Sequence, residues 1–547
     1  MPLSKNPVMS TDFQAKRFDY RHHPAHVAAA PVRHAVVIVG AGPVGMTLAL
    51  DLAQQNIPVV VLDDDDKLSA GSRAICFAKR TLEIWDRLGV GEAMVAKGVS
   101  WNVGKVFLRD AALYRFDLLG EAGHRRPAFI NLQQYYAEGF LFDAVEKTPL
   151  IEVRWKSRVA HAKNNADGVT LHVETPDGAY ALHADYVVAC DGSRSTMRNL
   201  LGLESKGQTF RDRFLIADVK MTAPFPSERW FWFDPPFHPN QSVLLHRQPD
   251  NVWRIDFQLG WDADPDEEKK PERVRPRVQA LLGPDAEFEF EWISVYTFAC
   301  MRMERFRHGR VLFAGDSAHL VSPFGARGAN SGVQDADNLG WKLGWVVRGD
   351  APDALLDSYA SEREYAADEN ILNSTRATDF ITPKSDISRV FRDAVLALAK
   401  AHPFARKLVN SGRLSVPSTL HESPLNTPDA DAFSGLMMPG AAAVDAPVMV
   451  AERQDWFLNL LGGDFVVVRV CHAAPSSSQQ VTLTISRLRN RQTDKTVSAS
   501  VEWLTRYDAQ PGTTYLFRPD QHVCARWRSY NEHAVLAAFA RACGKDV

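Results

Sequence analysis

GRVLFAGDSAHLVSPFGARGAN, at residues 309–330, joins a short apolar run to a glycine-rich loop. The apolar run 311–314 predicts a buried strand, which ends at Gly315 and Asp316. Pro323 and further glycines follow before a helix-like segment begins. A carboxylate at the tip of a strand can bind a polyol, and the N-terminus of a helix stabilises a ring that carries negative charge. The stretch therefore predicts a site for a ligand with both features.

A second glycine motif, Gly40-x-Gly42-x-x-Gly45, lies near the N-terminus. It follows the β-branched run 34–39 and opens the helix-like stretch 46–55, which is the context that a dinucleotide-binding turn requires. The first glycine permits the tight turn, the second lets the backbone approach a pyrophosphate, and the third lets the helix pack on the strand. The motif predicts a βαβ unit that binds dinucleotide phosphates.

Two acidic residues at predicted strand ends extend this signal. Asp63 ends the strand 58–62, 18 positions beyond Gly45, where a carboxylate accepts hydrogen bonds from an adenosine ribose. Asp191 ends an apolar run and precedes Gly192, a pair that is most often only a turn. The glycine motif and Asp63 alone do not distinguish FAD from NAD.

Composition indicates an ordinary globular protein of two or three domains. The chain has 547 residues, of which 45% are hydrophobic and 24% are charged, and its formal net charge is −3. This balance gives no general attraction to nucleic acid, and no apolar run reaches the ~18 residues of a membrane helix. We therefore expect neither as a partner. Residues 1–33 lack the apolar core of a secretory signal and predict a flexible tail.

The six cysteines are scattered, without a CxxC pair or a Cys/His cluster of zinc spacing. This pattern favours free thiols in a reducing compartment, so we expect the enzyme or binding protein in the cytoplasm. The same pattern predicts no metal site.

Changes of pattern divide the chain further. Residues 206–300 are rich in aromatic residues and alternate like strands, which predicts a β-rich domain inserted into an α/β domain at 34–205 and 301–375. Residues 376–430 mix helix with a Pro/Ser-rich linker, and residues 431–547 predict a separate unit. The predicted elements of that unit are strands at 465–470, 497–504, 514–517 and 524–527 and a helix at 532–543.

The three motifs, in this order, resemble those of the single-component FAD-dependent aromatic hydroxylases. The pattern is nearest to the phenol and 3-(3-hydroxyphenyl)propionate hydroxylases. The most specific part is Pro323-x-Gly325-x-x-Gly328-x-Asn330 after the Gly315-Asp316 pair. The resemblance is firm over residues 34–375 and looser to the C-terminus. It implies an α/β fold: a Rossmann-like FAD-binding domain of the 4-hydroxybenzoate hydroxylase type with an inserted β-rich substrate domain.

The resemblance implies tightly but non-covalently bound FAD, with a part for each motif residue. The implied contacts are Gly40, Gly42, Gly45 and Asp63 with the ADP half, Arg73 near the pyrophosphate, Gln134 with the ribityl or phosphate region, Asp191 with FAD and NAD(P)H, Gly315 and Asp316 with the ribityl chain, Pro323 with the reactive edge of the ring, and Gly328, Ala329 and Asn330 with its pyrimidine side.

The resemblance also implies the reaction. NAD(P)H visits transiently and reduces the flavin, O2 forms a flavin C4a-hydroperoxide, and its distal oxygen passes to an electron-rich carbon of a phenolic ring. An apolar pocket keeps the peroxide from water. The substrate, the position hydroxylated and the choice between NADH and NADPH stay open.

Candidates for the substrate pocket come mainly from the inserted domain. Trp232 lies in an aromatic strand, His246 and Arg247 end another, and Tyr296 precedes the Gly315 loop, where Pro323 completes the set. A loose match to 4-hydroxybenzoate hydroxylase implies that Arg247 binds a substrate carboxylate. Each residue has a structural alternative: a core aromatic, a solvated surface pair or a structural tyrosine.

The C-terminal unit, residues 431–547, resembles the thioredoxin-like domain appended to the phenol and phenylpropionate hydroxylases. A working redox domain needs a CxxC pair, which is absent. The resemblance therefore implies a structural or oligomerising role, and we expect a homodimer.

Two other functions remain to be separated from hydroxylation. The run Trp230-x-Trp232-x-Asp234-Pro235 half-matches a motif of flavin-dependent halogenases, with Asp in place of Ile. A flavin- or NAD-binding sensor without catalysis is the second alternative. A halogenase needs halide and externally reduced flavin, and a sensor shows no turnover.

Overall fold

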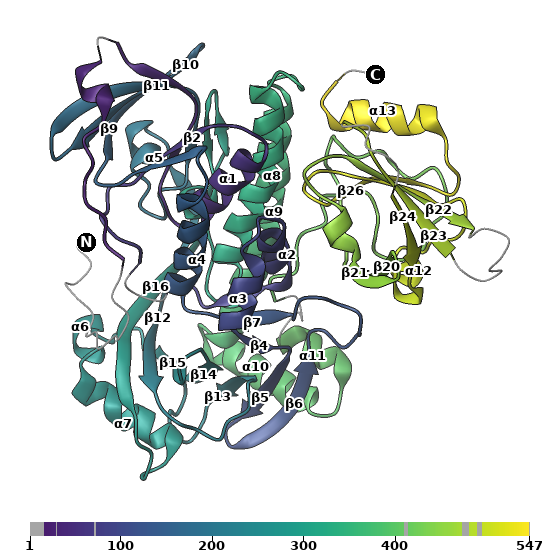
Figure 1. Cartoon of the computed structure of the whole chain (residues 1–547). Helices are drawn as coiled ribbons and strands as arrows, with labels where there is room; N and C mark the ends of the chain where they lie inside the picture. The colour runs from purple at the N-terminus through teal and green to yellow at the C-terminus, as the bar shows by residue number, and fades with distance from the viewer. Residues whose placement is uncertain are drawn as a thin grey trace.

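The computed structural model of the chain describes residues 16–28, 30–69, 73–409, 414–472, 481–489 and 495–545. It has the α/β fold that the sequence predicts, with three large β-sheets. In Figure 1 the first sheet and its helices form the upper part, the second sheet lies below them, and the third lies to the right with the C-terminus.

The first sheet is mostly parallel. Its strands are β1 (Val32–Val39), β2 (Val59–Leu62), β8 (Ile151–Arg154), β9 (Arg158–Asn165), β10 (Gly168–Thr175), β11 (Gly178–Ala189), β17 (Arg307–His308) and β18 (Val311–Phe313). Parallel pairing joins β18, β11, β1, β2 and β8 in that order, and β9, β10 and β17 add antiparallel pairs. The Val- and Ile-rich runs of β1 and β2 are typical of strands buried on both faces.

The carboxyl ends of four parallel strands meet at one edge of this sheet. β1 leads into Gly40, β2 into Asp63, β11 into Asp191, and β18 into Gly315 and Asp316. Ligands of open parallel α/β sheets bind beyond the carboxyl ends of the strands. The fold therefore brings the three predicted motifs to one place.

Helices and a small three-stranded sheet surround this edge. The helices are α1 (Pro43–Gln54), α2 (Lys79–Arg87), α3 (Gly91–Lys97), α4 (Gln134–Glu146), α5 (Thr196–Leu200), α8 (Gly328–Val347) and α9 (Leu355–Ile381), and the small sheet has β3 (Cys76–Ala78), β4 (Val99–Trp101) and β7 (Phe129–Asn131). Helix α1 packs against α4 and α8. Both α1 and α8 begin at the carboxyl edge of the first sheet.

The second sheet has the order β19-β16-β12-β15-β14-β13-β5-β6. Its strands are β5 (Val103–Leu108), β6 (Ala111–Asp117), β12 (Ser205–Lys220), β13 (Arg229–Phe233), β14 (Ser242–Arg247), β15 (Val252–Leu259), β16 (Glu289–Met303) and β19 (His319–Leu320). The predicted insertion at 206–300 supplies most of it but omits β5, β6 and β19. The parallel pairing of β13 with β5 joins segments more than 100 residues apart, which no local pattern signals.

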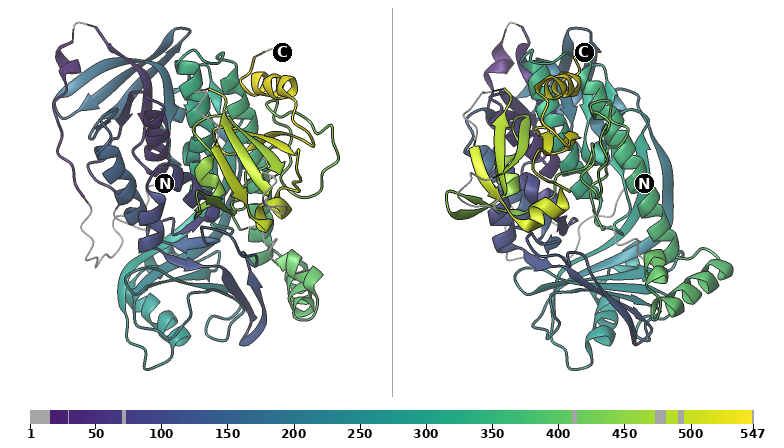
Figure 2. Two further views of the ribbon diagram at one scale, coloured as in Figure 1. Left: turned by 45° about the vertical axis from the view of Figure 1, so that its right-hand side comes forward. Right: turned by 90° about the vertical axis from the view of Figure 1, so that its right-hand side faces the viewer.

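Helices cover parts of both faces of the second sheet. They are α6 (Pro265–Glu268), α7 (Pro271–Leu282), α10 (Asp386–Ala399) and α11 (Pro403–Val409). Val274 and Val278 of α7 pack against one face, and Leu396 of α10 packs with Phe233 on the other. Figure 2 shows α10 and α11 beside the end of the sheet that β6 forms. The remaining part of that second face is turned toward the first sheet.

The third sheet belongs to the C-terminal unit. Its elements are β20 (Pro447–Val450), β21 (Arg453–Trp456), β22 (Val466–His472), β23 (Val481–Arg487), β24 (Lys495–Ala499), β25 (Thr514–Phe517), β26 (Val523–Trp527), α12 (Val501–Arg506) and α13 (Glu532–Ala542). The strand predicted at 497–504 is wrong in its second half. The Ser500 side chain accepts a hydrogen bond from the Trp503 N–H and begins α12 there. A thioredoxin-like fold for this unit stays a prediction.

The C-terminal unit packs on α8 and α9 through an apolar cluster and buried charges (Figure 1). Trp341 of α8 meets the ring of Phe465 at 5.5 Å. Arg518 donates to both carboxylate oxygens of Glu362 on α9, at 2.6 and 3.0 Å. Lys342 of α8 donates to Glu362 at 2.7 Å, and all three charged side chains are fully buried. The unit is therefore joined to the helices that frame the predicted site.

Residues 16–28, within the predicted tail, lie against the first sheet. The Phe18 ring stacks on Trp155 at 4.3 Å, and His22 contacts the carboxylate of Asp177 at 2.9 Å. Residues 1–15 and 29 lie outside the described residues.

Three observations bear on membranes, metals and disulfides. The described residues include no helix that is long and apolar enough to cross a membrane. Within the same ranges, no group of three His, Cys, Asp or Glu side chains is arranged to hold a metal ion. All six cysteines are free thiols.

Candidate functional site

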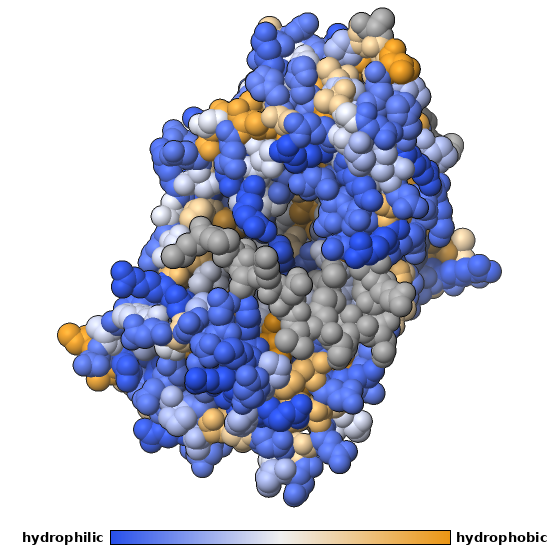
Figure 3. Space-filling model, turned by 90° about the vertical axis from the view of Figure 1, so that its left-hand side faces the viewer, coloured by the Kyte–Doolittle hydropathy of each residue, from blue (hydrophilic) through white to orange (hydrophobic). Residues whose placement is uncertain are grey.

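A cavity of about 1070 Å³ lies between the carboxyl edge of the first sheet and one face of the second. Its volume exceeds the range of about 300–1,000 Å³ that one drug-sized ligand occupies, so it can hold a long ligand and a small one together. On the side of the molecule shown in Figure 3, the surface is mostly hydrophilic and is hollowed near its middle, where hydrophobic residues are visible in the depth.

The turn after β1 is so tight that two of its positions require glycine. Gly40 has a φ of +108°, and a Cβ there would lie 2.4 Å from the carbonyl oxygen of Cys190. A Cβ on Gly45 would lie 2.0 Å from the carbonyl oxygen of Gly40. Gly42 lines the cavity, and a Cβ there would meet nothing within 4 Å. The backbone can therefore approach a ligand closely at Gly42.

Helix α1 offers N–H groups at this turn, and Asp63 stands beside it. The N-cap residue Gly42 has no side chain to accept them, and Met46 donates the first hydrogen bond back, to Gly42 at 3.0 Å. One oxygen of Asp63 accepts from the N–H of Ala41 at 2.6 Å, and the other accepts from Asp65. Burial raises the pKa of Asp63, although both hydrogen bonds favour the carboxylate.

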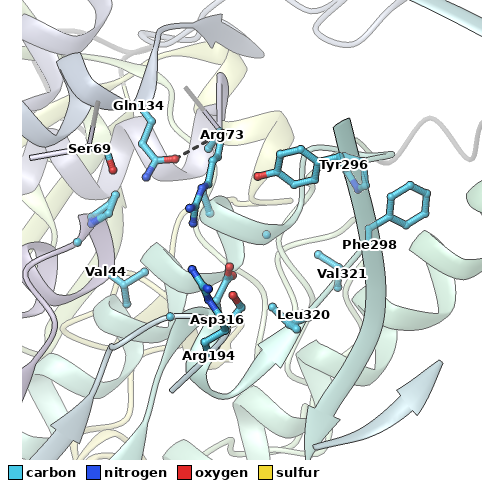
Figure 4. Close-up of a pocket in the computed structure, with 18 of the residues that line it drawn as sticks. Val44, Ser69, Arg73, Gln134, Arg194, Tyr296, Phe298, Asp316, Leu320 and Val321 are labelled. Carbon is cyan, nitrogen blue, oxygen red and sulfur yellow. Dashed lines mark hydrogen bonds between the residues drawn. The ribbon is translucent and has the colours of Figure 1, made fainter. Parts of the chain in front are cut away.

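Arg73, Gln134 and Ser69 lie around the middle of the cavity (Figure 4). The amide oxygen of Gln134 accepts from the N–H of Ala74 at 3.1 Å, and its nitrogen donates to Glu138 at 2.8 Å. Glu138 also accepts from the N–H and the hydroxyl of Ser69. These bonds fix the side chain of Gln134 at the beginning of α4.

Asp191 and Arg194 line the cavity from the loop after β11. The Asp191 carboxylate accepts from the N–H of Met197 at 2.9 Å, at the beginning of α5. Burial raises the pKa of Asp191. In Figure 4 Arg194 lies beside Asp316, so the loops after β11 and β18 meet in the cavity.

Asp316 projects into the cavity from the turn after β18 (Figure 4). Gly315, with a φ of +67°, makes this turn, and its N–H donates to Asp335 of α8 at 2.9 Å. Asp335 also accepts from His319 at 2.7 Å and from Arg363 at 2.6 Å, and these interactions hold the pKa of Asp335 below the ordinary value despite burial. The surrounding protein desolvates Asp316 and raises its pKa.

Helix α8 begins where the Pro323 loop ends, and its first turn faces the cavity. Pro323, Gly328, Ala329 and Asn330 all line it. The N-cap residue Arg327 makes no capping hydrogen bond with its side chain. The N–H groups of the first turn are therefore available to a ligand that carries negative charge.

The Asn330 side chain ties this first turn to β3. Its oxygen accepts from the N–H of Ala78 at 2.8 Å and from the hydroxyl of Thr81 at 2.7 Å. Its nitrogen donates to the carbonyls of Cys76 at 2.9 Å and Ala326 at 2.6 Å. The side chain of Asn330 is thus structural, and its backbone is what faces the cavity.

Replacing Asn330 by alanine is expected to lower the free energy of unfolding by about 2–4 kcal/mol, because buried N–H and carbonyl groups lose their partners. Urea unfolding of the variant followed by circular dichroism measures this change. Asn373→Ala removes one half-buried bond to Glu369 and serves as the control, with a small expected effect. An unchanged midpoint for Asn330→Ala would contradict the structural assignment of this side chain.

The second sheet supplies the opposite wall of the cavity. Phe214 on β12, His246 on β14, and Tyr296 and Phe298 on β16 line it. In Figure 4 the hydroxyl of Tyr296 points toward Arg73 across the cavity. Burial raises the pKa of Tyr296, so the phenol is neutral.

Two residues predicted for the substrate pocket lie on the other face of this sheet, and the prediction is corrected for them. Trp232 stacks on Phe107 at 5.1 Å, and Arg247 lies over the ring of Trp253 at 5.8 Å. Neither is among the described residues that line the cavity. Side chains alternate along a strand, so a shift of one residue changes the face. The halogenase-like Trp230-x-Trp232 pair shares this outer face.

Three charged residues of the wall were missed by sequence reasoning: Arg229, Arg254 and Asp256. In the sheet, Arg254 is the antiparallel partner of His246, and Asp256 is that of Leu244. Counted in steps of two from His246, Leu244 of β14 also faces the cavity, and so do the residues of β15 that pair with both. The sequence alone does not contain the cross-strand register that this count needs.

The residues around the cavity fit FAD. A tight glycine turn opens onto the cavity beside the N-terminus of α1, which suits a pyrophosphate, and Asp63 stands at the position for a ribose. The first turn of α8 also offers N–H groups to the cavity, and Asp316 presents an accessible carboxylate there. The cavity thus combines two helix N-termini with a carboxylate.

Comparison with known proteins agrees with this fit. Residues 33–374 match a family described as FAD binding domain. A 3-(3-hydroxy-phenyl)propionate/3-hydroxycinnamic acid hydroxylase of Mycolicibacterium smegmatis is 31% identical over 395 residues, which cover 71% of this chain and 68% of the relative. A probable NADH-specific resorcinol 4-hydroxylase of Rhodococcus jostii is 34% identical over 338 residues, covering 60% of this chain and 62% of the relative.

A solved structure shares the fold over most of the chain. The flavin-dependent monooxygenase PieE, in complex with FAD and substrate, superposes with a TM-score of 0.77 at 20% identity, covering 94% of this chain and 100% of PieE. The family match spans more than half of the chain and includes all the strand ends that line the cavity. The chain therefore belongs to the FAD-binding-domain family and is an FAD-dependent aromatic monooxygenase.

Proposed function

We propose that this enzyme hydroxylates a phenolic ring with O2 and NAD(P)H, and that FAD lies along the cavity from the Gly40 turn to the beginning of α8. The proposed contacts are Gly40, Gly42, Gly45 and Asp63 with the ADP half, Arg73, Gln134 and Asp191 with the middle, Gly315 and Asp316 with the ribityl chain, and Pro323, Gly328, Ala329 and Asn330 with the ring. Their common cavity supports this arrangement.

FAD supplies electron transfer from NAD(P)H and the activation of O2. The N–H groups at the beginning of α8 stabilise negative charge at the end of the cavity where the ring would lie. Phe214, Phe298 and Pro323 wall that end with apolar groups and limit the access of water. Tyr296, neutral at physiological pH, is placed to donate a hydrogen bond to an oxygen on the substrate.

The observation that carries the proposal is the meeting of four strand ends, the Pro323 loop and an aromatic wall in one cavity. The relatives named above are described as acting on a hydroxyphenylpropionate and on resorcinol, which supports a phenolic substrate here.

The test is to purify the yellow enzyme and to follow NADH and NADPH oxidation with a panel of phenols. We expect at least one phenol to accelerate NAD(P)H oxidation about tenfold or more, with hydroxylated product in excess of hydrogen peroxide. Halide-dependent chlorination with externally reduced flavin would instead support the halogenase. Bound flavin without any turnover would support the sensor.

Replacing Asp316 by asparagine is expected to weaken FAD binding about tenfold, because hydrogen bonds to a charged acceptor contribute about 1.5–3 kcal/mol. Titration of the apoenzyme with FAD, followed by flavin fluorescence, measures the affinity. Asp368→Asn is the control, since Asp368 pairs with Arg302 on the surface, away from the cavity. Equal affinities in the wild type and Asp316→Asn would argue against the proposed ribityl contact.

We also propose that the enzyme works in the cytoplasm as a homodimer, without nucleic acid or membrane partners. The six free thiols are typical of a reducing compartment, and the net charge of −3 gives no attraction to nucleic acid. Light scattering tests the assembly: a dimer has twice the chain mass of 61.0 kDa.

A further inference from the structure

A second cavity, of about 340 Å³, lies where the C-terminal unit meets the helices of the FAD-binding part. Residues of α1, α2 and α8 form one side, and Gly463, Arg489 and Pro519 of the C-terminal unit form the other. Its volume is at the lower end of the range of about 300–1,000 Å³ for ligand sites. The two cavities share no described lining residue, so the second one is separate from the proposed flavin site.

Arg87 of α2 lines the second cavity and bonds through only one of its three nitrogens. Its Nη2 donates to Asp51 at 2.5 Å and to Asp337 at 2.6 Å. Within the described residues, its buried Nε has no partner and its Nη1 makes no hydrogen bond. Asp51 also accepts from Gln55, and Asp337 also accepts from Arg80. The two carboxylates are therefore shared, while Arg87 keeps N–H groups without an acceptor.

Arg348 and Trp341 repeat this pattern in the wall of the second cavity. Arg348 donates through Nε to Asp350 at 2.8 Å and through Nη1 to the carbonyl of Gln55 at 3.1 Å. Its buried Nη2 has no partner among the described residues, and neither has the indole N–H of Trp341, which is 2% exposed. Buried polar groups in folded proteins are nearly always hydrogen-bonded, so three such donors around one cavity indicate a missing acceptor.

Arg489 adds a guanidinium from the C-terminal unit. Its Nη2 lies 2.6 Å from the carboxylate of Asp350, and the group lies 5.5 Å from the centre of the Trp345 ring. Asp350 is thus shared between Arg348 and Arg489, as the other carboxylates at the second cavity are shared. Donors therefore exceed acceptors here. This surplus fits a ligand that is negatively charged and has several acceptor oxygens.

We propose that the second cavity binds a small oxyanion, the carboxylate or phosphate group of a small molecule, which joins the C-terminal unit to α2 and α8. Arg87 and Arg348 hold the anion from one side and Arg489 from the other, and the indole N–H of Trp341 donates to one of its oxygens. A buried donor without an acceptor is costly, and the anion removes that cost. The inference does not rest on the proposed hydroxylation, and it gives the C-terminal unit a binding role.

The experiment titrates the FAD-loaded enzyme with inorganic phosphate and, separately, with succinate, and follows binding by isothermal calorimetry. The buffer contains neither phosphate nor carboxylate, and potassium chloride keeps the ionic strength constant. We expect at least one of the two anions to bind with a Kd of about 1 mM or below. At saturation it should raise the melting temperature by about 2 °C or more, because it binds the folded enzyme. The two probes distinguish a phosphate from a carboxylate.

Two variants locate the bound anion. Arg489→Gln removes a cation that is bonded only to Asp350, and it should weaken binding about tenfold. Trp341→Phe keeps an aromatic ring and removes the N–H, and it should weaken binding about threefold or more. Arg453→Gln is the matched control, since Arg453 is exposed on the same unit and does not line the second cavity. FAD content and melting temperature without the anion establish that each variant is folded.

Either of two results would overturn the proposal. If neither anion bound more tightly than chloride at the same ionic strength, the second cavity would hold only water. If Arg489→Gln and Trp341→Phe bound the anion as the wild type does, the anion would lie elsewhere. Because binding and melting temperature are measured without turnover, an enzyme that failed to hydroxylate any phenol would count against the proposed function alone.

Discussion

Alanine in place of Gly40 is expected to yield an enzyme that purifies almost free of FAD. The φ of +108° disfavours any side chain, and the new Cβ would lie 2.4 Å from the carbonyl oxygen of Cys190. The Gly40 N–H also bonds to Leu62 at 2.7 Å, and the Cys190 N–H bonds to Val39 at 2.7 Å. To avoid this overlap, β1 must move away from β11 or β2 must shift. Because these bonds join the ends of β1, β2 and β11, either movement displaces the strand ends that line the cavity.

Backbone strain of about 1–3 kcal/mol, added to this displacement, should weaken FAD binding about 100-fold or more. The absorbance of flavin relative to protein in the purified sample, followed by titration with FAD, measures the loss. Gly120→Ala is the matched control, since Gly120 is exposed and a Cβ there meets nothing within 4 Å. A fully yellow Gly40→Ala enzyme would show that the turn does not hold FAD.

Replacing Glu362 by glutamine is expected to destabilise the enzyme by about 3–5 kcal/mol, because the buried Lys342 loses its ion pair and the buried Arg518 keeps only Asp520. Glu362 accepts from both guanidinium nitrogens of Arg518 and from Lys342, and all three side chains have no exposed surface. These cations hold the pKa of Glu362 far below its ordinary value of 4.5. The melting temperature measured by calorimetry should fall accordingly.

The sign of the pH dependence follows from this lowered pKa. The stabilisation by Glu362 is complete above the ordinary pKa of 4.5 and is lost as the pH falls toward the lower folded value. The difference in the free energy of unfolding between the wild type and Glu362→Gln should therefore shrink as the pH falls below about 4.5. Lys206→Ala, which breaks an exposed pair with Glu304, should change stability by about 0–1 kcal/mol. If Glu362→Gln and Lys206→Ala lost the same stability, burial would not explain the contribution of Glu362.

Local patterns predicted the parts of the site that depend on a few consecutive residues. The Gly40 turn, Asp63 and the Gly315 loop each follow directly on an apolar strand, and the positive φ of Gly40 and of Gly315 favours glycine there. The structure places them together because parallel strands end at a common edge. What each of these residues contacts in FAD stays a prediction.

The wall of the cavity was predicted less well, because it depends on register between distant strands. Trp232 and His246 are equally plausible from composition, yet only His246 faces the cavity. The contribution of β5 to the second sheet arises from parallel pairing with β13, a contact without a local signal. Arg229, Arg254 and Asp256 were missed for the same reason, since pairing between strands decides that they face the cavity.

Helix α8 lines the cavity with its first turn and packs against the C-terminal unit with its later turns. Trp341 packs against Phe465 of the C-terminal unit. Lys342 and Arg518 of that unit both donate to Glu362 on α9. Gene recombination between relatives that exchanged residues 431–547 alone would pair these side chains with foreign partners. Crossovers that transfer α8 and α9 together with the C-terminal sheet keep these pairs, so we expect them to be tolerated better than exchange of the C-terminal unit alone.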